Sequence, residues 1–505
     1  MNSALFIGAS GMKGLSQGLQ VTTNNIANVS TLGYKQQSIL FSDLIYASQG
    51  NLGSGWESQE DSKVALGQTG MGVQVDTIRT LFNQGNFESS NTVSDLAING
   101  KGFFQVSDDE SGALYYTRAG DFRADEAGVL RNPSGLALNG YQYDANVTRS
   151  NTLSSVTIDK FSVMPAKATS SVSLTLNLDP ANDNVTDAQN PYFSLLGSYD
   201  ATQTVPLASD AYSGTQAMTI YDATGTAHTV TLYFDAAPAQ SGSKAVEFIA
   251  TREVQPRFDD TGKLIPNEVG DGLLMSGLLH FDSAGRLLDI SAFTPATAGS
   301  KDLADWQAAS LSSTGQPQLD INGQAVSLDF GLSTNGGWQN APASAADVGT
   351  DSNLLPVLGN GVIRSETASV ANGGSLGHYS QDGYPAGTLN RYYIHQDGTV
   401  EGYFSNGQTQ DLWQIPLCRF VSEDGLRREG SNLFSATEAA GQMDVGVAGS
   451  ENFGEISAYN IEQSNVDLSS EMVNMIITQR GFQSNSKVVT TADQMLQKAM
   501  ELKRH

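Results

Sequence analysis

Cysteine is almost absent from this sequence, in which Cys418 is the only one among 505 residues. A single cysteine cannot form an internal disulfide, so a disulfide-stapled fold is excluded. Within the run QIPLCRF we expect Cys418 to be a small buried core residue, because free cysteine is among the most buried residue types. No run approaches the ~18 consecutive apolar residues of a membrane-spanning helix, so we expect no membrane insertion.

Positive charge is also scarce, because 27 lysines and arginines face 53 aspartates and glutamates, for a formal net charge of −26. Nucleic acid and anionic membranes attract basic surfaces, so we expect neither as a partner. The acidic excess lies in the middle of the chain. Residues 1–45 carry two lysines and one aspartate, and residues 455–505 carry five basic and six acidic side chains. The nearly neutral ends can therefore approach one another.

Catalytic and metal-binding patterns are missing as well. The GASG run at residues 8–11 has the wrong spacing for a nucleophile elbow, and GNG at residues 359–361 lacks the third glycine of a dinucleotide-binding loop. The five histidines are scattered without the spacing of metal ligands. We therefore expect no enzyme, no cofactor and no metal site.

The composition disfavours a helical bundle, since the chain has 52 glycines and only 16% charged residues. Apolar and polar residues alternate with a period of two at residues 170–179, 229–235 and 399–404, which predicts strands. Turns of the form Asp-x-x-Gly recur between such runs. We predict a mainly β fold of two or three nested β domains, with helices confined to the two ends.

Each end carries a seven-residue repeat of apolar side chains. This repeat predicts two amphipathic helices with coiled-coil-like seams, and we expect these helices to pair with each other. The N-terminal seam consists of Leu5, Met12, Leu19 and Ile26. The C-terminal seam consists of Ile461, Leu468, Met475, Phe482, Val489 and Leu496, with Met472 and Gln479 in its second row.

The N-terminal repeat runs into a polar stretch, NNIANVSTLGYK, at residues 24–35. Asparagine is a poor helix former, yet Asn24, Asn25 and Asn28 lie together on one side of the predicted helix. One interpretation is a solvent-facing helix end that stops at Gly33 in the left-handed conformation. The other is that these amides form hydrogen bonds to neighbouring chains and fix the register between them.

Changes in composition and period indicate a nested arrangement, in which the terminal helices pair and one β domain is split around an insertion. A Gly- and Ser-rich stretch after the first helix predicts an extended connector. The expected segments are residues 1–70 (helix and connector), 71–160 (first half of the split β domain), 161–365 (an inserted outer region of one or two β domains), 366–454 (second half) and 455–505 (C-terminal helix).

Both ends resemble the signatures of the flagellar axial proteins, the rod and hook family. ALFIGASGMKGLSQGLQVTTNNIANVSTLGYKQQSILFSDL has the Asn-Asn-x-Ala-Asn core, followed by a stop of Gly33, Tyr34 and Lys35. IEQSNVDLSSEMVNMIITQRGFQSNSKVVTTADQML resembles the matching C-terminal signature. DLAINGKGFFQV resembles the β region that follows in this family, and MPAKATSSVSLTLNLD and TIYDATGTAHTVTLYF are most similar to its hook members.

The resemblance implies a structural subunit outside the cell. Many copies would form a helical tube, with the paired terminal helices around a central channel and the β domains outside. Hook members form a flexible universal joint that carries torque from rod to filament. Implied partners are the rod, hook-cap and hook-filament junction proteins and the flagellar type III export apparatus. Such export, without a cleaved signal peptide, replaces the cytoplasmic location that the N-terminal residues alone predict.

Physical reasoning supports the same role. A helix with one apolar seam, on a chain whose remaining mass is β and acidic, lacks a second surface against which to pack. Head-to-tail contacts that do not close generate a helical filament. We therefore predict that both seams, the three asparagines and the stop of Gly33, Tyr34 and Lys35 form a polymerisation interface.

Two alternatives stay open. A distal rod subunit would share the terminal signatures, but we would expect a much smaller insertion. A secreted β-rich adhesin or polysaccharide-acting enzyme would need a cleft lined with aromatic and acidic side chains, and Trp306 and Trp338 in the insertion are candidates for such a lining.

Overall fold

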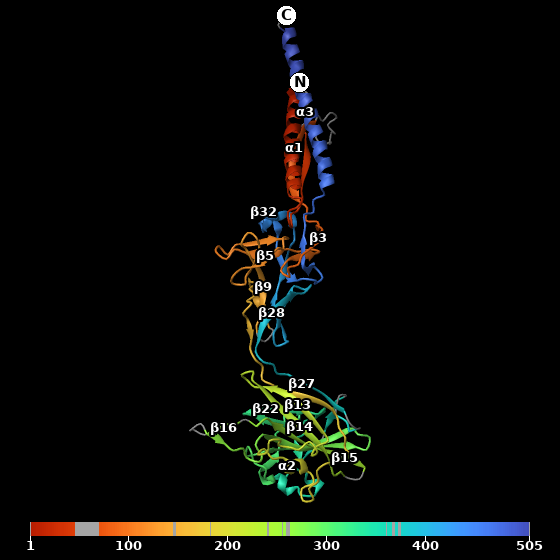
Figure 1. Cartoon of the computed structure of the whole chain (residues 1–505). Coiled ribbons are helices and arrows are strands. Elements are labelled where there is room, and N and C mark those ends of the chain that lie inside the picture. Colours follow the sequence, from red (N-terminus) through yellow and green to blue (C-terminus); the bar gives the residue numbers. More distant parts are fainter. Residues whose placement is uncertain are drawn as a thin grey trace. The chain divides into compact units, whose positions relative to one another are not determined.

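The computed structural model describes residues 2–45, 70–144, 148–181, 183–239, 242–254, 256–258, 263–359, 361–365, 369–371 and 375–503. The chain is mainly β, with one long helix at each end (Figure 1), which confirms the predicted fold class. It divides into two compact units. Unit 1 comprises Met1–Ser162 and Thr388–His505, and unit 2 comprises Val163–Gly387.

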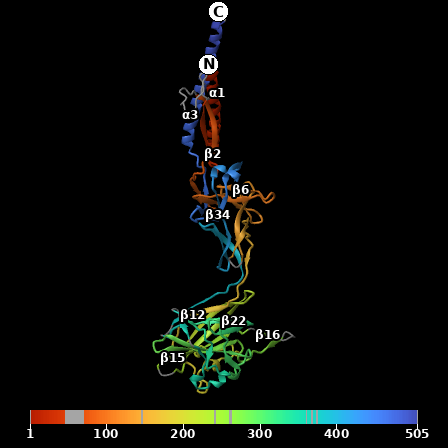
Figure 2. The same ribbon diagram turned by 180° about the vertical axis from the view of Figure 1, so that it is seen from behind.

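The terminal helices form one end of unit 1. Helix α1 (Asn2–Ala27) and helix α3 (Leu468–Lys503) lie side by side, as Figures 1 and 2 show from opposite directions. Strands β1 (Gln37–Ile45) and β2 (Gly70–Thr80) form an antiparallel hairpin against α1. We call these four elements the helical part of unit 1. Within the described residues, no helix carries an apolar run suited to crossing a lipid bilayer.

Helix α3 begins seven residues later than the apolar repeat does. Ile461 lies in a strand, so its predicted place in the helical seam is wrong. The helix starts at Leu468 because the carboxylate of Asp467 accepts hydrogen bonds from the backbone N–H groups of Ser469 (2.8 Å) and Ser470 (3.3 Å). An aspartate in this position satisfies backbone donors that have no partner within the helix.

The remaining strands of unit 1, which we call its β part, come from both halves of the split chain. Neighbouring strands along the main sheet are antiparallel. Their order is β28 (Gly387–Ile394), β29 (Thr399–Phe404), β30 (Thr409–Gln414), β9 (Ala137–Tyr143), β5 (Phe104–Ser107), β6 (Leu114–Thr117), β33 (Leu433–Ser435) and β32 (Arg427–Gly430).

Short antiparallel pairs also join early strands of the β part to late ones. They are β3 (Phe87–Ser89) with β36 (Asn460–Glu462), and β4 (Leu96–Asn99) with β35 (Glu455–Ala458). The other strands are β7 (Arg123–Ala124), β8 (Leu130–Arg131), β10 (Arg149–Ser155), β31 (Pro416–Phe420) and β34 (Met443–Val447). The core between them includes Phe104, Leu138 and Trp413, so residues from both halves of the chain are buried together.

Unit 2 consists of two sheets around a shared core. The first has the order β13 (Gly214–Tyr221), β14 (Ala227–Ala237), β15 (Ser243–Arg252), β18 (Leu273–Asp282), β19 (Leu287–Pro295) and β20 (Trp306–Ala308). The second has the order β21 (Gln318–Ile321), β22 (Gln324–Asp329), β12 (Ser171–Asn177) and β27 (Ser375–Gln381). Leu174 of β12 and Phe248 of β15 belong to the same buried cluster, so the two sheets pack face to face.

Shorter elements complete unit 2. They are β11 (Val163–Met164), α2 (Ser194–Ser198), β16 (Arg257–Phe258), β17 (Leu264–Ile265), β23 (Leu332–Ser333), β24 (Trp338–Gln339), β25 (Val357–Leu358) and β26 (Ile363–Arg364).

The chain stays in unit 2 until Gly387, whereas the sequence pattern assigned residues from 366 onward to the returning half of the split domain. Strand β27 pairs with β12 in antiparallel register, Val172 opposite Gln381. Its partner lies about two hundred residues earlier in the chain. The Gly- and Ser-rich composition around β27 gave no sign of this strand.

A pair of acidic side chains binds α2 and the loop before it to the sheet of unit 2. Both carboxylate oxygens of the buried Glu247 lie within hydrogen-bond distance of the backbone N–H of Leu195, at 3.0 and 3.1 Å. Asp235, opposite Glu247 on β14, accepts hydrogen bonds from the backbone N–H groups of Asn184 (2.9 Å) and Val185 (3.1 Å). Burial raises the pKa of Glu247 to about 8 and also raises the pKa of Asp235.

We predict that the stability of unit 2 falls as the pH rises from about 5 to 8. The folded-state pKa of Glu247 is above the unfolded value of ~4.3, so folding favours the protonated form, at up to about 1.4 kcal/mol per pH unit. Glu247→Gln has a side chain of the same shape that does not titrate, so in this variant the stability of unit 2 should depend less on pH. Calorimetry of the full chain between pH 5 and 9 measures it, and an equally steep fall in the variant would contradict the assignment.

Candidate functional site

The polar stretch that ends the N-terminal repeat lies where the helical part joins the β part of unit 1. Asn25 is only 1% exposed. Its Oδ1 accepts hydrogen bonds from the backbone N–H of Gln37 (2.9 Å) and from the hydroxyl of Tyr34 (3.2 Å). Its Nδ2 donates to the backbone carbonyl of Gln37 (2.8 Å) and to Glu471 Oε2 (3.3 Å) on α3. Its own chain thus uses both polar atoms of Asn25, and the predicted contact with a neighbouring chain stays a prediction.

Asn24 and Asn28 are more exposed and also have partners within the chain. Asn24 Nδ2 donates to the Tyr34 hydroxyl (3.2 Å) and to Gln37 Oε1 (3.3 Å). Asn28 Nδ2 donates to the backbone carbonyl of Asn24 at 2.8 Å, in the last turn of α1. The same carbonyl also accepts a hydrogen bond from the backbone N–H of Asn28 at 3.2 Å, so the Asn28 side chain adds a second contact to this helix end.

Gly33 adopts the predicted left-handed conformation, with φ of 65°. It does not follow the helix directly, however, because α1 ends at Ala27. A Cβ atom at Gly33 would lie 2.5 Å from the backbone nitrogen of Ala119, so the chain is also too close there for any side chain. Gly33 thus allows the end of the helical part to touch the β part.

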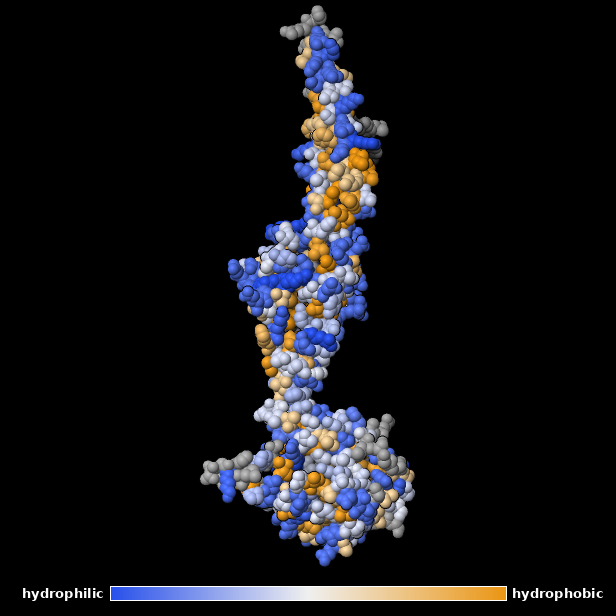
Figure 3. Space-filling view, in the orientation of Figure 1, coloured by the Kyte–Doolittle hydropathy of each residue, from blue (hydrophilic) through white to orange (hydrophobic). Residues whose placement is uncertain are grey.

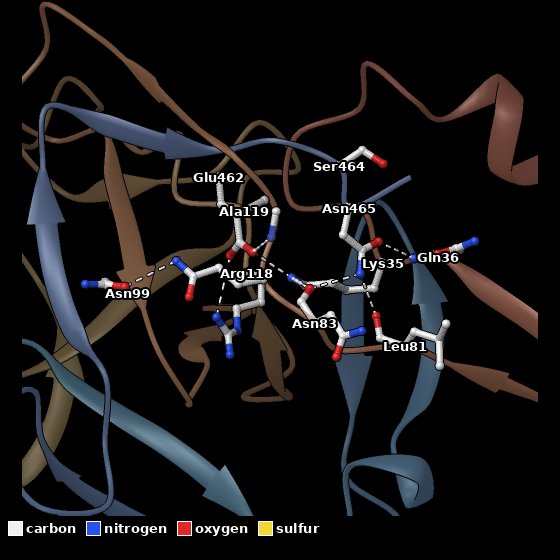
Figure 4. A network of polar contacts seen from close by, with 12 residues as sticks. Lys35, Gln36, Leu81, Asn83, Asn99, Arg118, Ala119, Glu462, Ser464 and Asn465 are labelled. Atoms are coloured by element: carbon white, nitrogen blue, oxygen red, sulfur yellow. Dashed lines mark hydrogen bonds and ion pairs between the residues drawn. The ribbon is translucent and has the colours of Figure 1, made fainter. Parts of the chain in front are cut away.

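The centre of this junction is a buried carboxylate shared by two buried cations (Figure 4). Lys35 Nζ lies 2.6 Å from Glu462 Oε1, and both side chains are fully buried. Arg118 Nη1 lies 3.5 Å from Glu462 Oε2, and Arg118 Nη2 donates to the backbone carbonyl of Gly100 at 2.9 Å. Glu462 also accepts from the backbone N–H of Gly85 at 2.8 Å, through Oε1.

Burial lowers the pKa of Lys35 and of Arg118, while the charge of Glu462 acts in the opposite direction on both. Removing one partner from a buried ion pair lowers the folding stability by more than the intact pair contributes to it, because the remaining charge stays desolvated. Glu462 comes from β36, 427 residues after Lys35. The junction therefore forms only when the two ends of the chain meet.

Further contacts join the same segments. Gln36 Nε2 donates to Glu471 Oε1 at 2.7 Å, and the backbone N–H of Gln36 donates to Asn465 Oδ1 at 2.7 Å. The guanidinium of Arg428 lies 4.8 Å from the ring centroid of Tyr34, a cation–π contact, and donates to the carbonyl of Lys35 at 3.2 Å. Burial raises the pKa of the Tyr34 hydroxyl, with the charge of Arg428 acting in the opposite direction.

Most of these partners were not found from the sequence. Glu462, Glu471 and Asn465 are polar residues whose partners lie about four hundred positions away, so no local pattern marks them. Their only signal is the resemblance itself, since all three lie inside the C-terminal signature. Asn25, Gly33, Tyr34 and Lys35, predicted as interface residues, are buried inside the subunit.

Helices α1 and α3 pack closely because glycines on α1 face α3. A Cβ atom at Gly8 would lie 2.7 Å from Val489 Cγ2, and one at Gly11 would lie 2.9 Å from Asn485 Nδ2. Small residues let two helix backbones approach. The sequence interpretation missed these glycines, because a heptad count considers only large apolar side chains. The predicted N-terminal seam residues are half-buried: Leu5, Met12, Leu19 and Ile26.

The structure divides the predicted C-terminal seam between two faces of α3. Met475, Val489 and Leu496 are half-buried, and Val489 contacts α1 at Gly8. Leu468, Met472, Gln479 and Phe482 are exposed. Three further apolar residues on the first turns are exposed and were not predicted: Val473, Ile476 and Ile477. Figure 3 shows hydrophobic side chains gathered on the surface beside the terminal helices.

We call the exposed residues Leu468, Met472, Val473, Ile476 and Ile477 the outer face of α3. Large exposed apolar patches are rare on monomeric proteins, and they usually mark a surface that binds a partner. In the hairpin, Leu40, Phe41 and Ile78 are also exposed. The helical part thus presents apolar side chains that no part of the described chain covers.

Four family models match segments of this chain. They are "Flagella basal body rod protein" at residues 5–35, "Flagellar hook protein FlgE/F/G D1 domain" at 97–164, "Flagellar basal body protein FlaE D2 domain" at 187–384 and "Flagellar basal body rod FlgEFG protein C-terminal" at 458–502. The first and last of these cover most of α1 and α3, and the D2 model lies within unit 2.

Relatives also match this chain along nearly its whole length. The flagellar hook protein FlgE of Salmonella typhimurium is 30% identical over 506 residues, covering 98% of both chains. The chain belongs to the flagellar hook protein family. FlgE of Treponema pallidum is 29% identical over 512 residues and covers all of both chains. A crystal structure of Helicobacter pylori FlgE2 covers 73% of this chain and 98% of its own, at 15% identity and a TM-score of 0.43.

The comparison confirms the family that the terminal signatures predicted. The alternative of a distal rod subunit gains no support, because hook proteins match this chain over its whole length, the insertion included.

We predict that Glu462→Gln destabilises unit 1 by about 3 to 5 kcal/mol, since it leaves Lys35 and Arg118 buried without a counter-charge. Chemical denaturation of the full chain measures the loss. Glu88→Gln is the matched control, because Glu88 is an exposed carboxylate on β3, beside β36, and accepts one hydrogen bond from Gln463. Equal effects of the two variants would contradict the role of Glu462.

We predict that Gly8→Leu separates α1 from α3, although leucine favours a helix over glycine by roughly 0.8 kcal/mol. The added side chain has no room against Val489. Amide hydrogen exchange of residues 2–27 in the full chain should show lost protection. Ala9→Leu, at an exposed position of the same helix, should leave protection unchanged. Retained protection in Gly8→Leu would contradict close glycine packing.

Proposed function

We propose that the chain is the structural subunit of a flagellar hook. Copies assemble into a flexible, curved tube that transmits torque from rod to filament and encloses an export channel. The observation that carries this proposal is the outer face of α3, because α1 covers only the opposite face. Burying a large apolar side chain contributes roughly 1.5 to 3 kcal/mol, so five such residues per subunit give a substantial drive to assemble.

The interface in this proposal comprises the outer face of α3 and the predicted seam residues that are not covered in one subunit. Phe482 and Gln479 are exposed on α3 beyond that face, and Leu5, Met12, Leu19 and Ile26 are half-exposed on α1. Neighbouring copies cover these side chains. The contacts are head-to-tail, so they build a helical filament and not a closed dimer.

The junction around Glu462 suits the transmission of torque. Its ion pairs and hydrogen bonds link α1, the hairpin, β36 and α3, so a force on the β part reaches the helices through buried contacts. The acidic excess lies outside the two ends of the chain. Repulsion between acidic outer domains keeps their contacts weak, which allows subunits to slide as the tube bends.

The proposal places the chain outside the cell, exported by the flagellar type III apparatus without a cleaved signal peptide. Its partners are further copies of itself and the rod, hook-cap and hook-filament junction proteins. We propose no catalytic activity. Among the described residues, no group of three or more His, Cys, Asp or Glu side chains is arranged to hold a metal ion.

The adhesin or polysaccharide-acting enzyme loses the feature that favoured it. Trp306 is fully buried and donates its indole N–H to the backbone carbonyl of Ser300 at 3.2 Å. Trp338 packs against the core of unit 2 and donates to the carbonyl of Ala309 at 2.6 Å. Both tryptophans serve the core of unit 2, and neither supports a ligand-binding cleft.

We predict that the double variant Met472→Asp and Ile476→Asp abolishes tube formation while units 1 and 2 stay folded. Two buried carboxylates in the interface would be desolvated without partners. Electron microscopy at high salt, which screens the net charge, measures assembly. Ser134→Asp with Gln408→Asp adds the same charge at exposed polar positions of the β part, away from the proposed interface, and should still assemble.

Tubes from the Met472 and Ile476 variant at the concentration that suffices for the unaltered chain would refute the proposed interface. Straight, rigid tubes from the unaltered chain would favour the rod alternative over the hook.

A further inference from the structure

A groove of about 470 Å³ lies in unit 1, where strand β2 of the helical part ends beside the end of β31. Three cations line it: Arg79, Lys101 and Arg419. Within the described part of the chain none of these three forms an ion pair, and Arg419 donates only to the backbone carbonyl of Asn452, at 3.3 Å. The groove thus gathers three cations in a chain with a net charge of −26.

Two other features of the groove define what it can accept. Val421 lies on its lining and is 83% exposed. Two carboxylates, Glu423 and Asp424, lie on the same lining beyond Val421. The groove therefore offers positive charge, an uncovered apolar side chain and negative charge within one short surface. A complementary partner needs an acid, a base and an apolar side chain close together.

Unit 1 carries such a segment. Asp159, Lys160 and Phe161 are consecutive and exposed, and Phe161 is 86% exposed. Phe161 and Val421 are the two most exposed large apolar side chains among the described residues. The carboxylate of Asp159 accepts a hydrogen bond from the backbone N–H of Phe161 at 2.8 Å, which fixes the turn and presents the ring outward.

The segment and the groove lie at opposite ends of the β part. The backbone N–H of Leu389 in β28 donates to the carbonyl of Ser162 at 3.0 Å, so the segment lies beside β28. Val421 lies between β31 and β32 in the chain, and six strands separate β28 from β32 along the main sheet path. Figure 1 shows β32 close to the helices and β28 at the far end of the β part. The two sites of one copy cannot meet.

We propose that the Asp159–Lys160–Phe161 segment of one copy docks into the Val421 groove of the next copy. Phe161 packs against Val421, Asp159 faces the three cations, and Lys160 faces Glu423 and Asp424. The inference rests on the proposed function, since it requires copies in a filament. Two different surfaces at opposite ends of one unit make a heterologous contact, which extends along a filament without closing.

Carbodiimide cross-linking of the unaltered chain tests this contact. The reagent joins an amine to a carboxylate that lies in direct contact with it. Peptide mass spectrometry of treated tubes should find Lys160 joined to Glu423 or Asp424, and Lys101 joined to Asp159. The same treatment of dilute monomers should give neither product. Tubes that yield other cross-links between copies, but none of these, would overturn the docking arrangement.

A pair of variants gives an independent test. Phe161→Asp should raise the concentration needed for tube formation at least about tenfold, because it removes the buried ring. Leu114→Asp alters an exposed apolar residue on β6 and should leave this concentration unchanged. Equal assembly of Phe161→Asp and the unaltered chain would refute the contact. Failure of the unaltered chain to form tubes would instead refute the proposed function, and this inference with it.

Discussion

Burying two cations against a single carboxylate is the constraint on which unit 1 depends. Lys35 and Arg118 belong to the first third of the chain, and both lie without solvent around Glu462, which comes from the last tenth. Without the carboxylate, either buried cation would strongly destabilise the folded unit. The split β domain therefore closes only when the C-terminal strand β36 arrives, and the position of α3, which begins six residues after Glu462, is set by the same event.

The arrangement of the helices follows from that closure. Asn25 and Gln36 both bind Glu471 in the first turn of α3, so the start of α3 is fixed beside the end of α1. Glycines on α1 then allow the two helices to approach along their length. With one side of α3 used in this way, its outer face stays exposed. The same polar residues that looked suited to contacts between chains thus determine which apolar surface of α3 remains exposed.

The sequence predicted what local periodicity and family signatures encode, namely the two terminal helices, the β middle, the split domain and the family. It failed where the partner of a residue is distant or where the signal is the absence of a side chain. Nothing near Asn25 indicates that Glu471 will accept its hydrogen bond. A count of large apolar residues at heptad spacing does not include Gly8. Ile461 continued the repeat by coincidence, because an Asp467 cap starts the helix later and a strand takes the preceding residues.

An electron cryomicroscopy reconstruction of tubes assembled from the unaltered chain would test the central claim most directly. The account predicts that α1 packs against α3 of the same copy through Gly8 and Gly11, that Lys35 and Glu462 stay paired inside each subunit, and that a neighbouring copy covers Met472 and its surroundings. A reconstruction in which α1 packs on α3 of another copy, or in which the outer face of α3 lines the open channel, would contradict it.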